Sequence, residues 1–303
     1  MRLGHELPLD GPLNRALEAF ATDVSAKTAG RVEIKVFGAA TLGGDRALSE
    51  QVRLGGIELA NLGVATQAPL DPQFSIEEIP YAWGSLDQIQ AAFQGPLGQI
   101  LGKKMTELGA HPLSFHPFGF RHLTNNVRAV RLPEDITGLK LRLAEVPIRL
   151  DTFQLLGAQP VPIAFAEVFT ALQQGTVDGQ ENPLAIITGA RLFEVQKHLS
   201  LTGHIANMNW LVINQAYFAS LPDDVKEALS TEAAKIGPRV LEEIKSTDAK
   251  LLQQLKDSGM EVVENIDKDA FRKVLAPIYE KYSKSFDPEL WNALLASSNA
   301  GKQ

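Results

Sequence analysis

The chain has no cysteine, an absence that excludes disulfides, thiolate nucleophiles, cysteine-ligated metals and cysteine redox motifs. It also lacks any run of about 18 apolar residues, so the sequence predicts no membrane-spanning helix. Its start lacks the charged and apolar regions of a signal peptide, which leaves either a cytosolic protein or a mature form with an added methionine. The missing cysteine fits an oxidising compartment, but many cytosolic proteins share this absence.

The motifs of the common enzyme classes are absent as well. There is no G-x-S-x-G, no H-E-x-x-H, no P-loop lysine motif and no G-x-G-x-x-G between a strand and a helix. The histidines are scattered, and His111 and His116 lie five residues apart on a predicted strand, where they point to opposite faces. We therefore expect no catalytic residue, no metal and no cofactor.

Charge and length narrow the class of protein further. The formal net charge is −7 and no stripe of Lys and Arg with interleaved aromatic residues is visible, so nucleic acid is not an expected partner. The 303 residues fit about two domains of roughly 150 residues each. Hydrophobic residues make up 45% and charged residues 21%, values typical of a globular protein that buries a large core.

The spacing of hydrophobic residues predicts alternating strands and helices. A helix at 12–27 carries an apolar stripe at three- and four-residue spacing, and a strand covers 57–62. The β-α-β-α-β order of the first part favours a parallel sheet, and we expect two α/β lobes. Residues 222–258 are predicted to form one helical stretch, with no internal glycine or proline except Gly237-Pro238, that is long enough to run across both lobes.

One arginine stands at the end of a predicted strand. Arg142 lies in the strand at 140–143. A guanidinium group forms two parallel hydrogen bonds to a carboxylate and stays charged when partly desolvated. At the carboxyl end of a strand in an open α/β sheet, it would lie where such folds bind ligands. An arginine at a strand end is more often a solvated surface residue, so the spacing leaves both interpretations open.

Residues 178–182 are predicted to form a polar turn that feeds a helix beginning at Pro183. Asn182 is then a natural N-cap with proline at the first helical position, which explains the asparagine without any ligand. A helix N-terminus is also a site for anions, so the two roles are compatible.

Three further residues are candidates for the same site. Arg121 lies at the expected crossing between the lobes, where hinged binding proteins place both hinge and ligand contacts. Phe165 and Trp210 are aromatic residues near strand ends, a position that core packing usually explains.

Specific segments follow one another in a fixed order: Gly138-Leu-Lys-Leu-Arg142, the run from Pro162 to Gln173, Gly175 to Pro183, and Phe193 to Leu199. Together they resemble the solute-binding proteins of tripartite ATP-independent periplasmic (TRAP) transporters, of the dicarboxylate-binding-protein type. The resemblance covers essentially the whole chain, including residues 35–44 and the long helix.

The resemblance implies a role for each candidate residue. Arg142 takes the place of the family's main carboxylate anchor, while Asn182 and Phe165 take the places of residues that contact the ligand. Arg121 matches a second cation that sialic-acid-binding members use. Residues in variable pocket-lining regions are expected to set specificity, and they are His5, Glu6, Gln67, Trp83 and Trp210.

The implied fold has two α/β lobes with a ligand cleft between them and a long helix that spans both. We expect the first lobe to contain residues 1–120 and about 206–246, and the second about 121–205 and 247–303. The implied protein is a monomeric periplasmic receptor, its signal peptide removed, that delivers a small organic acid to the membrane subunits of a TRAP permease.

The sequence leaves more than one ligand class and more than one role open. A sugar acid, a small hydroxy or keto acid, or an aromatic acid would suit the candidate residues, and we favour a monocarboxylate with hydroxyl groups. The alternatives to a transport receptor are a sensing protein that reports to a membrane signalling partner, and an enzyme on the same scaffold.

Overall fold

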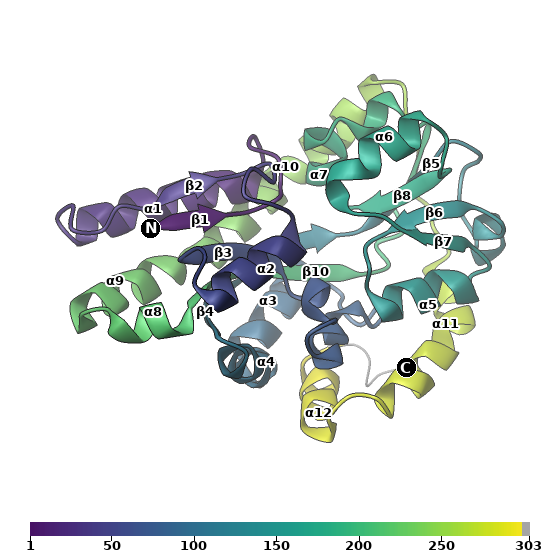
Figure 1. The fold of residues 1–303 in the computed structure, drawn as a ribbon. Coiled ribbons are helices and arrows are strands. Elements are labelled where there is room, and N and C mark those ends of the chain that lie inside the picture. The colour runs from purple at the N-terminus through teal and green to yellow at the C-terminus, as the bar shows by residue number, and fades with distance from the viewer. Residues whose placement is uncertain (299–303) are drawn as a thin grey trace.

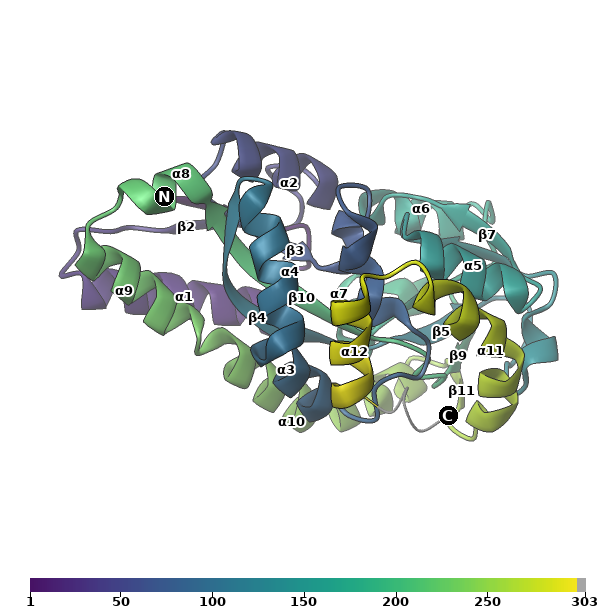
Figure 2. The ribbon, with the colours of Figure 1, turned by 90° about the horizontal axis from the view of Figure 1, so that it is seen from below.

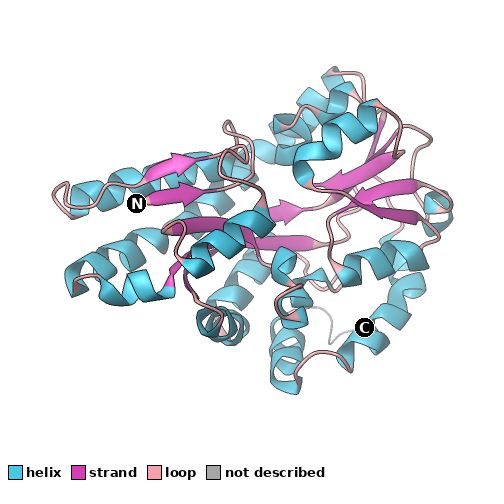
Figure 3. Ribbon diagram, viewed as in Figure 1, coloured by secondary structure: helices cyan, strands magenta, loops and turns pink. Residues whose placement is uncertain are grey.

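The computed structural model describes residues 1–298, which form two α/β lobes lying side by side (Figure 1). Each lobe is built on its own sheet, and helices pack around it (Figure 3). Each sheet collects strands from segments that are far apart in the sequence, so neither lobe is one continuous stretch of chain. The predicted two-lobe α/β fold is confirmed.

The strands of the first sheet are β1 (Arg2–Gly4), β2 (Lys35–Phe37), β3 (Leu59–Gly63), β4 (Ala110–Phe120) and β10 (Ala206–Asn214). Their spatial order is β2-β1-β3-β10-β4. The strands β1, β2 and β3 pair in parallel, whereas β10 pairs antiparallel with both β3 and β4. The parallel pairing predicted from the β-α-β-α-β order of the first part is therefore confirmed for β1, β2 and β3, and the antiparallel β10 lies outside that prediction. That strand enters from the far half of the chain, so no helical crossover joins it to its neighbours.

The strands of the second sheet are β5 (His122–Asn125), β6 (Lys140–Leu143), β7 (Gln159–Pro162), β8 (Gly179–Asn182), β9 (His198–Ser200) and β11 (Glu261–Val263). Their spatial order is β11-β9-β5-β8-β6-β7. The strand β6 pairs in parallel with β7 and β8, and β5 pairs antiparallel with β8 and β9. The central position of β8 places its side chains beside those of both β5 and β6.

Helices cover both sheets. Those on the first lobe are α1 (Pro12–Lys27), α2 (Asp45–Leu54), α3 (Leu86–Gln94), α4 (Pro96–Glu107), α8 (Gln215–Ser220) and α9 (Asp223–Ala233). Those on the second lobe are α5 (Pro147–Leu155), α6 (Val168–Gln173), α7 (Leu184–Gly189) and α11 (Lys268–Ser283). The predicted helix at 12–27 is confirmed, and its apolar stripe is buried. In the described part of the chain, no helix is both long and apolar enough to cross a membrane.

The chain crosses between the lobes along a long helix and again near its end. Helix α10 (Ile236–Asp257) packs on α1 and β4 of the first lobe and on α7 of the second (Figure 2). Helix α12 (Pro288–Ser297) packs on α3 and α4, although the preceding α11 packs on α5 of the second lobe. The chain thus returns to the first lobe near its end, whereas residues 247–303 were predicted to belong to the second lobe. The full division of the chain between the lobes stays a prediction.

The long helical stretch predicted over 222–258 is two helices. Helix α9 ends at Ala233 and α10 begins at Ile236, so Gly237-Pro238 lies in the first turn of α10. Backbone N–H groups in a first helical turn have no partner within the helix, so a proline there removes no hydrogen bond. The single helical stretch predicted over 222–258 is therefore divided before Gly237-Pro238 and not at it.

The segment predicted to be a polar turn is a buried strand. All four residues of β8 are buried. Helix α7 begins at Leu184 with Pro183 at the N-cap position, so the predicted N-cap role of Asn182 is wrong. The polar composition is misleading because the hydrogen-bond partners come from distant segments. Gln180, for example, donates from Nε2 to Thr124 Oγ1 at 2.9 Å.

The close pairing of β8 with β5 predicts the effect of one substitution. A Cβ atom on Gly179 would lie 2.1 Å from the carbonyl oxygen of Thr124. Gly179→Ala should therefore lower the free energy of unfolding by roughly 3 kcal/mol or more, at or beyond the upper end of ordinary overpacking. Urea denaturation measures the change.

The control is Gly102→Ala in α4, where the nearest atom to an added Cβ, in Pro112, is 3.7 Å away. That variant should gain about 0.5 to 1 kcal/mol because alanine restricts the unfolded chain. Equal stabilities of the two variants would contradict the predicted clash.

Candidate functional site

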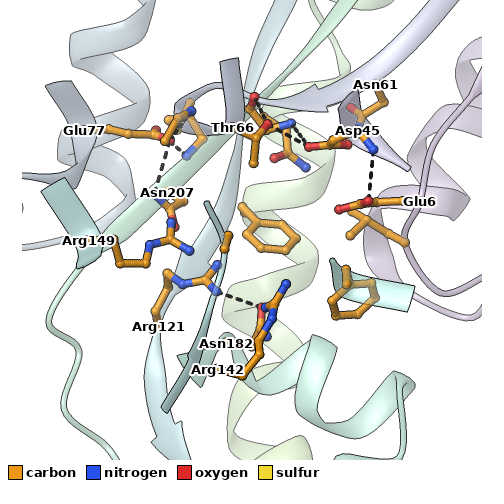
Figure 4. A pocket seen from close by; sticks show the side chains of 18 residues that line it. Glu6, Asp45, Asn61, Thr66, Glu77, Arg121, Arg142, Arg149, Asn182 and Asn207 are labelled. Atoms are coloured by element: carbon orange, nitrogen blue, oxygen red, sulfur yellow. Dashed lines mark hydrogen bonds between the residues drawn. The ribbon is translucent and has the colours of Figure 1, made fainter. Parts of the chain in front are cut away.

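A cavity of about 60 Å³ lies between the lobes, and Figure 4 shows the side chains around it. Its first-lobe wall comes from the ends of β1, β3 and β10 and the start of α2, and its second-lobe wall from β6, β8 and the segments that follow β4 and β7. Strand ends from both sheets thus meet at one place. The lining residues are Glu6, Leu7, Asp45, Asn61, Gly63, Ala65, Thr66, Glu77, Phe118, Arg121, Arg142, Ala144, Arg149, Phe165, Asn182, Asn207, Met208 and Asn209.

Arg142 is a buried cation that lines the cavity. It lies on β6 between Leu141 and Leu143, and its side chain is directed towards the cavity. Only 3% of the residue is exposed. Its Nε donates to the carbonyl oxygen of Ile163 at 2.8 Å, which fixes the guanidinium plane. Within residues 1–298, its two terminal nitrogens have no hydrogen bond and no ion pair, so they are available to a ligand.

This burial has an electrostatic cost. Burial lowers the pKa of Arg142 to about 10, and the like charges of Arg121 and Arg149 also lower it. The carboxylates of Glu181 and Glu6 act in the opposite direction and raise it. A guanidinium whose charged form is disfavoured in the folded protein gains the most from an anion that enters the cavity.

The other two arginines of the cavity are neutralised by protein carboxylates. Arg121 donates from Nε to Glu181 Oε2 and from Nη2 to Glu181 Oε1, the latter at 2.9 Å. Arg149 on α5 donates from Nε to Glu78 Oε2 at 2.8 Å and from Nη1 to Glu181 Oε1 at 3.2 Å. Glu181 and Glu78 are fully buried. We name these four residues the buried ion network, and it leaves Arg142 as the cation of this cavity without a carboxylate partner among the described residues.

Glu181 is the centre of the buried ion network. Burial works against its charged form, but Arg121 and Arg149 hold the pKa of Glu181 well below its usual range. His204 Nε2 lies 3.2 Å from Glu181 Oε2, and burial lowers the pKa of His204. The carboxylate therefore stays charged at neutral pH while the histidine beside it is neutral.

The buried ion network also orients Asn182. Arg121 donates from Nη2 to Asn182 Oδ1 at 3.0 Å, as Figure 4 shows, and Asn182 Nδ2 donates to Gln180 Oε1 at 2.5 Å. Both ends of the amide are thereby fixed. Its Nδ2 retains a second hydrogen at the edge of the cavity, on the same wall as Arg142.

The first-lobe wall presents carboxylates instead of cations. Glu6 follows β1, and its Oε2 accepts the backbone N–H of Asp45 at 3.0 Å, which caps the start of α2. Asp45 Oδ2 accepts from the backbone N–H of Gly63 at 3.0 Å and from Thr66 Oγ1 at 2.8 Å. Burial raises the pKa of both carboxyls, and the neighbouring Glu6 raises that of Asp45 further.

Amide side chains complete the first-lobe wall. Asn61 Oδ1 lies 2.7 Å from His116 Nε2, and burial lowers the pKa of His116 to about 3, so this histidine is neutral at physiological pH. Asn207 donates from Nδ2 to Glu78 Oε1 at 2.7 Å and accepts from Arg149 Nη2 at 3.2 Å. Asn207 thus connects the first-lobe wall to the buried ion network.

The structure brings together some of the residues predicted for the site and separates others. Arg142, Asn182, Arg121, Phe165 and Glu6 all line the cavity, and Phe165 is half-buried beside it. Their contact with a ligand stays a prediction. The predicted residues His5, Gln67, Trp83 and Trp210 do not line the cavity.

Each of these outlying residues is held by the protein core. Trp210 is fully buried on the interior strand β10 and packs edge-on against Phe74 at 5.2 Å between ring centroids. Ser49 donates to Gln67 Oε1 at 2.6 Å, and His5 Nε2 lies 2.8 Å from Asn14 Oδ1. Trp83 donates from Nε1 to the carbonyl oxygen of Glu77 at 3.4 Å.

Several lining residues carry no signal in the local sequence. Arg149 reads as an ordinary helix residue until Glu78, 71 positions away, is placed beside it. Asp45 reads as an acidic residue at a helix start, a pattern that the helix dipole explains by itself. Within residues 1–298, no group of His, Asp and Glu side chains is arranged to hold a metal ion.

Known proteins resemble this chain over nearly all of its length. The family model described as bacterial extracellular solute-binding protein, family 7, matches residues 3–285. A solute-binding protein of Verminephrobacter eiseniae is 38% identical over 272 residues, which cover 89% of this chain and 81% of that protein. The 2,3-diketo-L-gulonate-binding periplasmic protein of Escherichia coli is 31% identical over 275 residues, which cover 91% of this chain and 84% of that protein.

Solved structures agree with the fold. A TRAP periplasmic solute-binding protein from a Polaromonas species, bound to D-erythronate, is 35% identical with a TM-score of 0.94, and the match covers 97% of each chain. The sugar acid binding protein of Advenella mimigardefordensis, in complex with galactonate, is 30% identical with a TM-score of 0.95. That match covers 100% of this chain and 97% of the other.

Removing the central carboxylate should destabilise the protein. Glu181→Gln removes the carboxylate that pairs with Arg121 and leaves Arg149 paired with Glu78, and breaking a buried ion pair typically costs about 3 to 5 kcal/mol. Urea denaturation should show a loss of that order. The surface variant Glu194→Gln, which removes the same charge from an exposed pair with Arg191, should change stability by about 0.5 kcal/mol at most.

Removing the unpaired cation should have the opposite effect. Because the folded-state pKa of Arg142 is about 10, below its ordinary 12.5, the charged form is disfavoured by folding at neutral pH. Arg142→Met should raise the free energy of unfolding of the ligand-free protein by about 1 to 3 kcal/mol, after the loss of the bond to Ile163. A destabilised Arg142→Met protein, measured by urea denaturation at pH 7, would contradict this assignment.

Proposed function

The chain belongs to family 7 of the bacterial extracellular solute-binding proteins, the dicarboxylate-binding-protein type of TRAP receptor, and we propose that it binds a small organic acid between its lobes. The observation that carries the proposal is Arg142: a buried guanidinium with unpaired terminal nitrogens, facing a cavity between two lobes. A ligand carboxylate would accept two parallel hydrogen bonds from it. Relatives that hold D-erythronate and galactonate support a sugar acid as the first ligand class to test.

The second-lobe wall would hold the carboxylate end of the acid. Arg142 supplies the charge, Asn182 supplies an amide donor already fixed by Arg121, and Phe165 offers an aromatic face beside them. Arg121 acts as a positioning residue in this proposal, since its own charge is balanced by Glu181. The first-lobe wall would contact the remainder of the ligand.

Binding and closure would then be one process. An acid that touches Arg142 on one lobe and the Asp45 wall on the other makes its full set of contacts only when the lobes are close together. We propose that the closed form delivers the acid to the membrane subunits of a TRAP permease, with the receptor acting as a periplasmic monomer. Family members are transport receptors, and we assign no catalytic step to this chain.

A thermal-shift screen over organic acids tests the proposal directly. A ligand at about one hundred times its dissociation constant adds roughly 2.7 kcal/mol to stability, so binding acids should raise the melting temperature clearly. The panel should include aldonates, uronates, small hydroxy and keto acids and aromatic acids, with the corresponding neutral sugars as controls. Shifts caused only by neutral sugars or peptides would overturn the proposal.

Calorimetry on an arginine variant then tests the anchor. Arg142→Ala should cost about 2 to 5 kcal/mol of binding free energy because a ligand carboxylate is left without its partner. This corresponds to a roughly 30- to several-thousand-fold larger dissociation constant for whichever acid the screen identifies. Arg131→Ala, which removes an exposed arginine of the second lobe, should bind like the wild type. Wild-type affinity in Arg142→Ala would show that the carboxylate binds elsewhere.

A further inference from the structure

The two walls of the cavity differ in charge, and the difference bears on which acids fit. Arg142 lies on the second-lobe wall, whereas Glu6 and Asp45 lie together on the first-lobe wall, as Figure 4 shows. Within residues 1–298, no Lys, Arg or His nitrogen lies within 4.0 Å of either carboxylate. An elongated acid whose carboxylate contacts Arg142 therefore directs its other end towards two unpaired carboxyl groups.

Each of these carboxyl groups has one oxygen in use and one available. Glu6 Oε2 caps α2 through the backbone N–H of Asp45, and Asp45 Oδ2 accepts from Gly63 and Thr66. In the described chain, Glu6 Oε1 and Asp45 Oδ1 have no hydrogen-bond donor. The used oxygens hold both side chains in place, so the free oxygens form a fixed pair of acceptors.

A pair of fixed acceptors discriminates between ligand groups. A hydroxyl group donates a hydrogen bond to such an oxygen, whereas a carboxylate has no proton to donate and brings a like charge. Like-charge contacts in a site of low dielectric cost several kilocalories per mole and are a common means of rejecting a wrong ligand.

We propose that Glu6 and Asp45 select polyhydroxy monocarboxylates and reject dicarboxylates of the same length. The inference rests on the proposed function, because it places the ligand carboxylate at Arg142. It assigns the first lobe the task of recognising hydroxyl groups at the far end of the acid.

The raised pKa values of the two carboxyls do not remove this selectivity. Burial favours a proton on the pair, and the repulsion between Glu6 and Asp45 acts in the same direction for Asp45. A pair that holds one proton still carries one negative charge and still presents an acceptor oxygen. A second ligand carboxylate would therefore still meet a like charge on this wall.

Matched acids that differ only at the far end provide the test. D-erythronate and meso-tartrate share the same carbon chain and hydroxyl configuration, and the terminal CH₂OH of the first is a carboxylate in the second. D-galactonate and galactarate form the corresponding six-carbon pair. Calorimetry at pH 7.5 should show wild-type protein binding the monocarboxylate of at least one pair roughly a hundredfold or more tighter than its dicarboxylate.

Neutral variants of the acid pair should reduce that preference. Glu6→Gln and Asp45→Asn keep an oxygen for the existing hydrogen bonds while removing the charge. In the double variant the preference should fall below about tenfold, chiefly because the dicarboxylate binds more tightly. Glu50→Gln, which removes the same charge from an exposed position on α2, should keep the wild-type preference.

The outcomes separate this inference from the proposed function. If the acid screen fails and neither monocarboxylate binds, the proposed function and the inference fall together. If acids bind but the wild type accepts both members of a pair within about threefold, only the inference is overturned. An unchanged preference in a folded double variant, with circular dichroism as the check on folding, overturns it as well.

Discussion

Glu181 lies fully buried between the guanidinium groups of Arg121 and Arg149, and the rest of the site depends on this contact. Buried charges persist only when partners and hydrogen bonds replace the lost water. Glu181 and Glu78 supply those partners for two of the three arginines in the cavity. The third, Arg142, is held in the same desolvated region by the fold and one backbone carbonyl, and no carboxylate of the described chain forms an ion pair with it.

The same contact joins elements from both halves of the chain. Arg121 comes from the crossing between β4 and β5, Arg149 from a helix of the second lobe, and Glu78 from the first. A hydrogen bond across such a distance in sequence leaves no trace in local periodicity. This explains why helices and strand β6 were predictable from hydrophobic spacing, whereas the strand character of β8 was not. Buried polar strands look like turns until their partners are known.

Some residues of the candidate site were likewise predictable from the sequence, and others were not. Three residues that line the cavity stand in segments specific enough to identify a family, and they are Arg142, Asn182 and Phe165. Their place in the cavity was therefore predictable from the segments together, although physical reasoning on each residue alone left its role undecided. Trp210 shows the limit of that approach. An aromatic residue near a strand end suits a pocket, but β10 lies between two other strands of its sheet, with all nine residues buried, so Trp210 belongs to the core. Asp45 shows the converse, because the helix dipole accounts for it completely until the cavity is seen.

In the proposed binding mode, affinity and selectivity would be carried by different lobes. A cation without a partner attracts any carboxylate, so Arg142 alone would not distinguish a monocarboxylate from a dicarboxylate. Discrimination requires an element that disfavours the wrong ligand, and the acidic first-lobe wall has that character. Because the ligand would reach this wall only when the lobes are close together, the same contacts that would select the ligand would also contribute to the free energy of closure. An acid that binds Arg142 but is repelled by Glu6 and Asp45 would occupy the second lobe without stabilising the closed form.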